Sequence, residues 1–268
     1  MTVEPHPSGP PASTGAPYPG APVTYVAACE SGRPLRPLRW GMTDVVVAIL
    51  LALVVPTVVL GAVLSAGVAR NGAAVLLLSL VLPWVGFGLW PFLTTRLQGN
   101  GATIDLGLSV RRIDVLWGIG GGVACLVLGT LVAALTERVF GSFDSAAGDA
   151  LANADVAPWV VWVFTLCALV GAPLFEELCF RGLAFAAIAR TASRAGLPAV
   201  PWATVGSALL FSLVHLEPVR IPVLLTIGLV LSLLRARTGR VGASVIAHSL
   251  NNLIAVLGLV ASVTIPGF

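Results

Sequence analysis

Apolar residues fall into seven long runs, and the shorter stretches between them carry most of the charged and proline residues. The runs lie at about 43–69, 73–93, 115–135, 158–190, 199–216, 219–234 and 241–263. An α-helix needs roughly 20 apolar residues to cross the hydrocarbon core of a bilayer. The pattern therefore predicts an all-α, polytopic transmembrane bundle with about seven spans. The fifth and sixth runs are short, so they are expected to form either two crossing helices or a hairpin that crosses only in part.

The first 38 residues have a different character from the rest of the chain. They are rich in proline, glycine, alanine and serine and contain no apolar run. Such a segment buries too little apolar surface to offset the entropy of ordering, and it lacks the apolar core of a signal peptide. The sequence predicts a disordered tail over 1–38 and one transmembrane domain over 39–268.

Composition supports the membrane assignment and narrows the partners. The chain is 57% hydrophobic and 10% charged, with a mean hydropathy of +0.97, whereas a soluble domain carries about 25% charged residues. All 15 basic residues are arginines, which indicates a GC-rich, bacterial genome. The arginines are spread over several loops rather than gathered in one patch. This spread is typical of residues that set membrane topology and not of a nucleic-acid-binding surface. The expected partner is therefore the lipid bilayer.

The distribution of arginine predicts an orientation. Basic residues concentrate before the first run and in the stretches 96–112, 181–194 and 235–240, whereas the 136–157 stretch is acidic. Loops rich in arginine stay on the cytoplasmic side. The sequence thus predicts a multi-pass plasma-membrane protein of a bacterium, with its N-terminus in the cytoplasm and its C-terminus outside.

Two adjacent acids stand at the end of a strongly apolar stretch in the fourth run. Glu177 and Arg181 are four residues apart, so on a helix they share a face and can form an ion pair. Glu176 points elsewhere and has no partner nearby in the sequence. An ionised group inside a membrane costs several kcal/mol, roughly 2.5–3.5 on insertion scales, and therefore marks a functional site by default.

Two later runs contain polar residues in the same unusual setting. Helical spacing places Phe211 and His215 on one face of the fifth run, and His248 and Asn252 on one face of the seventh. An antiparallel hairpin joined near 191–198 returns His215 to the level of Glu176, because the two arms are about 21 Å and 24 Å long. We therefore expect Glu176, His215, His248 and Asn252 to share one site.

A glycine-rich stretch, Gly118–Gly122, could suggest a nucleotide-binding loop. Such a loop requires a strand before the glycines and a helix after them, but these glycines lie inside the third apolar run. Gly118 and Gly122 instead match the GxxxG spacing of closely packed membrane helices.

Three motifs follow one another in this order: Glu176-Glu177-x-x-x-Arg181, Phe211-x-x-x-His215 and His248-x-x-x-Asn252. The ordered set, over about residues 150–260, resembles the family of CAAX prenyl endopeptidases and bacteriocin-processing proteases (CPBP, or Abi, family). The Pro-rich tail is not a feature that this family requires.

The resemblance implies an intramembrane endopeptidase that acts on peptides or membrane-protein segments. It implies that Glu176 and His215 activate the attacking water and that His248 and Asn252 stabilise the oxyanion. Glu177, Arg181 and Phe211 would support the site. The bacterial character favours leader peptides or membrane-protein segments over prenylated CAAX proteins as substrates.

Other readings of the same residues remain open. Glu176, His215 and His248 could be three zinc ligands with an open fourth position for water. The chain has no HExxH motif and Asn252 is a poor zinc ligand, so a metal-free mechanism without a cofactor is favoured. A transporter also uses acids and histidines in the membrane, although it usually shows an internal repeat, and none is visible here. A family member that only binds partners is the third alternative.

Overall fold

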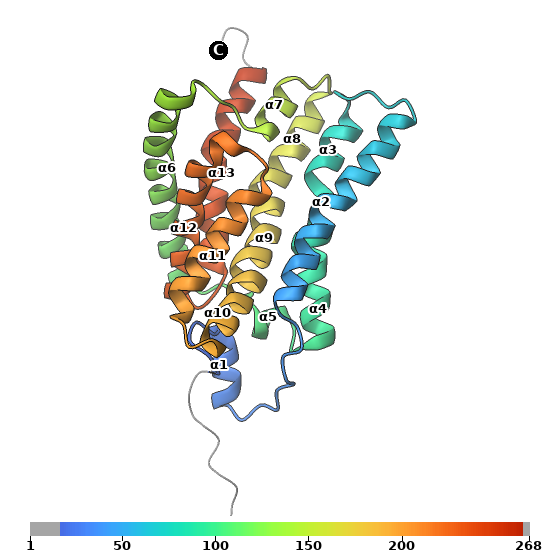
Figure 1. Ribbon diagram of the computed structural model, residues 1–268. Helices are drawn as coiled ribbons and strands as arrows, with labels where there is room; N and C mark the ends of the chain where they lie inside the picture. Colours follow the sequence, from blue (N-terminus) through green and yellow to red (C-terminus); the bar gives the residue numbers. More distant parts are fainter. Residues whose placement is uncertain (1–16, 265–268) are drawn as a thin grey trace, which may run out of the picture.

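The computed structural model describes the backbone of residues 17–264, and every regular element in that range is a helix (Figure 1). The predicted all-α class is confirmed. The helices are α1 (Val23–Glu30), α2 (Met42–Ser65), α3 (Ala73–Val81), η1 (Val85–Leu89), α4 (Trp90–Gln98), α5 (Ala102–Asp105), α6 (Arg112–Phe140), α7 (Ala146–Ala152), α8 (Pro158–Leu166), η2 (Cys167–Gly171), α9 (Ala172–Glu177), η3 (Leu178–Ala184), α10 (Phe185–Arg194), α11 (Ala199–Val214), η4 (Pro218–Arg220), α12 (Ile221–Thr238) and α13 (Gly242–Thr264).

Five helical segments are long and apolar enough to cross a membrane: Met42–Ser65, Ala73–Gln98, Arg112–Phe140, Pro158–Arg194 and Pro218–Thr238. The 16-residue α11 is a shorter apolar helix, and α13 is 23 residues long. Together they form seven helical passes that alternate in direction through one bundle (Figure 1). The protein is therefore a multi-pass membrane protein. The helix ends lie within a few residues of the ends of the seven apolar runs in the sequence.

The structure also settles how the fifth and sixth runs cross the bundle. The turn between α11 and α12 lies beside α7, because the Ala146 N–H donates to a carboxylate oxygen of Glu217 at 2.6 Å. The other end of α12 lies beside α1, because the Val23 N–H donates to the Gly239 carbonyl at 3.1 Å. Since α1 and α7 are at opposite ends of the bundle (Figure 1), α11 and α12 run between these two levels. With 16 and 18 residues, they are shorter than the 29-residue α6.

The predicted disordered tail is wrong in its second half. Residues 23–30 form α1, and Tyr18 and Tyr25 are buried. The hydroxyl of Thr24 donates to the Ile104 carbonyl at 3.1 Å, which fastens α1 to α5. Composition gave no sign of these anchors, because it does not show which single aromatic residues are buried against other helices. Residues 1–16 of the predicted tail lie outside the described residues.

The Pro158–Arg194 segment passes through the interior of the bundle and carries the first motif. All residues from Glu177 to Ala187 are buried. Two stretches of this segment, η2 and η3, have the wider turns of a π-helix. Such turns shift the phase of the helix on either side and are frequent at functional sites. The segment therefore turns different faces toward the neighbouring helices before and after the two glutamates.

The glycine stretch in α6 packs helices together, as its spacing predicts. A Cβ added to Gly118 would lie 2.6 Å from the Ile246 side chain, and one added to Gly122 would lie 2.7 Å from Leu250. Both contacts are made with α13, the helix that carries the third motif. The two glycines thus let α6 approach α13 closely and fix its position.

We expect Gly118→Ala to lower the thermal stability of the purified protein, by about 1–3 kcal/mol, since the new methyl group overlaps Ile246 and approaches the Ala243 carbonyl at 3.1 Å. Gly120→Ala is the matched control, because a Cβ there meets no atom within 4 Å. Thermal unfolding in detergent micelles measures both variants. Equal stability of the two would contradict the packing role of Gly118.

Candidate active site

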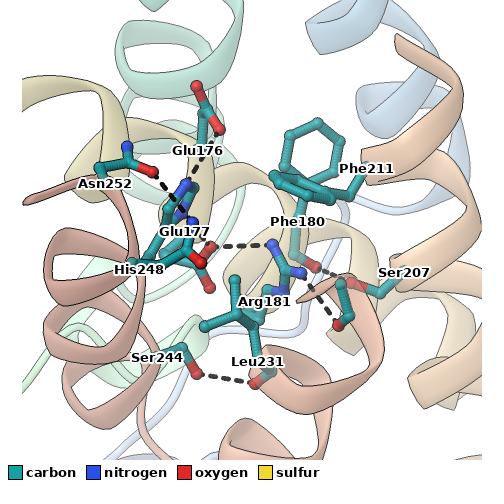
Figure 2. A network of polar contacts seen from close by, with 12 residues as sticks. Glu176, Glu177, Phe180, Arg181, Ser207, Phe211, Leu231, Ser244, His248 and Asn252 are labelled. Carbon is teal, nitrogen blue, oxygen red and sulfur yellow. Dashed lines mark hydrogen bonds and ion pairs between the residues drawn. The ribbon is translucent and has the colours of Figure 1, made fainter. Parts of the chain in front are cut away.

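Glu177 is the centre of the polar network in the bundle interior (Figure 2). Its side chain is fully buried at the end of α9. Two donors converge on its Oε1 atom: Arg181 Nη1 at 2.8 Å and His248 Nδ1 at 2.9 Å. The carboxylate thus joins the first motif to the third.

Arg181, one helical turn later, is fully buried as well. Its Nη2 donates to the Gly228 carbonyl on α12 at 3.0 Å, and its guanidinium carbon lies 4.6 Å from the centre of the Phe211 ring. Its own carbonyl accepts a hydrogen bond from Arg235 Nε at 3.0 Å. A buried guanidinium is tolerated when a carboxylate and further hydrogen bonds compensate its charge, and Arg181 has both.

Glu176 occupies a different environment from its neighbour. Its side chain is 17% exposed, and its Oε2 atom lies 3.9 Å from His248 Nε2. Among the described residues no hydrogen bond engages the Glu176 carboxylate. Glu176 is therefore the acid that is left free to act on a bound molecule, whereas Glu177 is committed to the protein.

The Glu177 contact orients the His248 ring. A carboxylate accepts hydrogen bonds, so the hydrogen between Glu177 and His248 belongs to Nδ1. The second ring nitrogen, Nε2, then faces Glu176 and can exchange a proton there. Sequence spacing alone could not show this link, because it joins residues 71 positions apart.

Phe211 connects the second motif to this network. Its ring lies edge-on to His215 and to His248, with centroid separations of 4.8 Å and 5.7 Å. The Phe211 carbonyl accepts from His215 Nδ1 at 2.7 Å, which again leaves Nε2 as the free ring nitrogen. Within the described residues no hydrogen bond or ion pair joins His215 to Glu176.

Asn252 lies one turn beyond His248 on α13. Its Nδ2 atom donates to the Ala168 carbonyl in the widened turn η2 at 3.1 Å. The neighbouring Asn251 makes only a long contact, 3.4 Å, with the Asn252 amide oxygen. The structure thus brings Glu176, Glu177, Arg181, Phe211 and His248 into one contact network, and places His215 and Asn252 at its edge.

A zinc site was the alternative use of Glu176, His215 and His248. No three His, Cys, Asp or Glu side chains are grouped to hold a metal ion in the part of the chain that the structure describes. Nδ1 of each histidine is engaged, by Glu177 in one case and by the Phe211 carbonyl in the other. Both Nε2 atoms are left unengaged, which is also how metal-ligating histidines are usually held.

A carboxylate–imidazole network lies in the interior of a bundle of membrane-length helices, and ionisable groups in such a setting mark a candidate functional site. Residues 158–254 match the family model described as type II CAAX prenyl endopeptidase Rce1-like. This match, over residues 158–254, supports membership of the family of CAAX prenyl endopeptidases and bacteriocin-processing proteases. The matched residues include all three motifs, so the resemblance found in the sequence is confirmed. Comparisons with curated proteins and with solved structures give no match.

We expect Arg181→Met to destabilise the protein by about 3–5 kcal/mol, because it leaves the Glu177 carboxylate buried without its guanidinium partner. Adding Glu177→Gln should restore part of that loss, since the buried charge disappears together with its partner. Unfolding of the single and double variants in micelles measures both effects. Arg138→Met, at an exposed position of α6, is the control. If the double variant is no more stable than Arg181→Met, the unpaired Glu177 charge is not the cause of the lost stability.

Proposed function

We propose that the protein is an intramembrane endopeptidase that hydrolyses peptide bonds in peptides or membrane-protein segments, with Glu176 as the general base. The observation that carries this proposal is the contrast between two adjacent acids. Glu177 is fully buried and bonded to Arg181 and His248, whereas Glu176 is partly exposed and borders His248 Nε2. A free carboxylate that faces an oriented imidazole is suited to acid–base catalysis on a water molecule.

In this mechanism Glu176 removes a proton from water, and His215, across the Phe211 ring, assists through its free Nε2. The resulting hydroxide attacks the substrate carbonyl. His248 and the Asn252 amide then donate hydrogen bonds to the oxyanion. Breakdown of the tetrahedral intermediate transfers the proton from Glu176 to the leaving amine.

Glu177 is a positioning residue in this scheme. To donate through Nε2 while Nδ1 is bound to Glu177, His248 must carry both ring hydrogens. The Glu177 carboxylate, 2.9 Å from Nδ1, fixes the orientation of the ring, as in hydrolase triads where an acid orients a histidine. Arg181 in turn holds Glu177 in place through their ion pair, so the first motif supports the third.

We also propose that the end of the bundle with α1 and α10 faces the cytoplasm of a bacterial cell. The arginine-rich stretches 33–39, 96–112 and 235–240 adjoin this end, and α7, within the acidic stretch 136–157, lies at the opposite one (Figure 1). This arrangement follows the positive-inside rule.

Glu176→Gln should lower the rate of peptide cleavage by roughly 10²–10⁴ while the protein stays folded, because it removes the proposed base without changing its volume. Cleavage of candidate leader peptides and membrane segments by purified protein measures this effect, and thermal unfolding checks folding. Glu137→Gln, at an exposed position, is the matched control. Full activity of Glu176→Gln combined with loss of activity in Glu177→Gln would mean that the roles of the two acids are reversed.

Asn252→Ala should reduce kcat by about 10²–10³ with little change in KM, since an oxyanion donor acts mainly in the transition state. Asn251→Ala should stay close to wild type, because that side chain makes only a long contact with Asn252. Steady-state kinetics on the same substrate compares the two. Equal effects at both positions would point to helix packing rather than catalysis.

Chelators should leave the wild-type rate unchanged, and the purified protein should contain no stoichiometric metal. Metal content by mass spectrometry and activity after chelation are the measurements. About one zinc per chain that is lost in His215→Ala or His248→Ala, with activity restored by added zinc, would replace the glutamate mechanism by a metal-dependent one.

A further inference from the structure

A second polar cavity lies at the arginine-rich end of the bundle, away from the site described above. Its volume is about 440 Å³, and it lies between the start of α2, α4 and the end of α10. Arg190, in its wall, follows Glu176 by 14 residues on one continuous helical segment, which is about 21 Å. The cavity is therefore separate from the proposed catalytic residues.

Arg190 is the informative residue of this cavity. The residue is only 7% exposed. Its Nη2 donates to the Trp40 carbonyl, and its guanidinium lies over the Trp40 ring, 4.0 Å from the centroid. Its Nε and Nη1 have no hydrogen-bond partner, and no carboxylate of the described residues pairs with it. A buried guanidinium with two free donors is costly unless an anion completes its shell.

The other groups around the cavity also favour an anion. Arg39 and Arg194 line it from exposed positions. The half-buried Trp90, whose indole Nε1–H lacks a partner, lines it as well. The first turn of the 24-residue α2 adds the partial positive charge of a helix N-terminus.

Asp44 is the one acid in the cavity lining, and its carboxylate is already engaged. It accepts hydrogen bonds from the Gly41 N–H at 2.9 Å and from the Thr94 hydroxyl at 2.7 Å. With three arginines against this one aspartate, the lining carries a formal charge of +2.

We propose that this cavity binds a phosphate-bearing anion, with an anionic lipid headgroup as its source. Arginine is the preferred partner of phosphate, because its planar guanidinium offers paired donors. The cavity is placed where membrane-length helices begin and end, which is the level of lipid headgroups. Val46 on α2 and Leu93 on α4, next to the lining residues, are exposed apolar side chains that acyl chains can cover. An anionic lipid thus matches the positive charge of the cavity lining and the apolar side chains beside it.

The test is binding of short-chain phosphatidylglycerol to the full-length protein in zwitterionic micelles, with phosphatidylcholine and inorganic phosphate as separate arms. Native mass spectrometry counts the bound molecules, and thermal shift gives the affinity. The variant is Arg39→Gln/Arg194→Gln, because both side chains are exposed and their loss should not disturb folding. We expect one phosphatidylglycerol per chain, bound at least about tenfold more weakly by this variant.

The matched control is Arg112→Gln/Arg237→Gln, which removes the same charge from exposed positions at the same end of the bundle but outside the cavity. It should bind like the wild type. Arg190→Gln, provided that it unfolds at a normal temperature, should also lose binding. Saturable binding of inorganic phosphate that competes with the lipid would support the site and identify a soluble anion as an alternative source. Equal binding of the two lipids by the wild type, or equal losses in the two double variants, would overturn the proposal.

Discussion

The fully buried Glu177 carboxylate is the feature on which the rest of the structure depends. A lone charge in such a position would be expelled or neutralised. Here a guanidinium from the same helix and an imidazole from α13 share one of its oxygens. Because Arg181 also bonds to the Gly228 carbonyl on α12 and lies against Phe211 on α11, one charge pair holds four helical segments in register. The same interaction that stabilises the bundle interior orients the histidine beside Glu176.

Closely packed helices supply the second constraint. α13 can deliver His248 to Glu177 only because α6 presents glycines to it at positions 118 and 122. The Ser244 hydroxyl, one turn before His248, donates to the Leu231 carbonyl on α12 at 2.9 Å and fixes the rotation of α13 from the other side. The Ser207 hydroxyl does the same for α11 by donating to the Phe180 carbonyl at 2.8 Å. The site thus rests on small residues that bring helix backbones together and on hydroxyls that bind their carbonyls.

The sequence predicted those parts of the structure that depend on local spacing. Apolar runs gave the helices, the i and i+4 positions gave the pairing of Glu177 with Arg181, and the GxxxG spacing gave the contact of α6 with α13. The link between Glu177 and His248 could not be predicted in this way, since it depends on how two helices 71 residues apart are rotated. The docking of α1 was missed for a similar reason, because its buried tyrosines interrupt a composition that is otherwise typical of a disordered chain.

The widened turn η3 has a consequence for how this chain can change over evolutionary time. It lies between Glu177 and Arg190, and each residue of a helix adds about 100° of rotation. An ordinary helical turn holds one residue fewer than the wide turn. The stretch 178–184 is therefore where this segment could lose a residue while Glu177 and Arg190 both keep their partners. Deletion of a residue elsewhere between them would instead rotate Arg190 by that angle relative to Glu177.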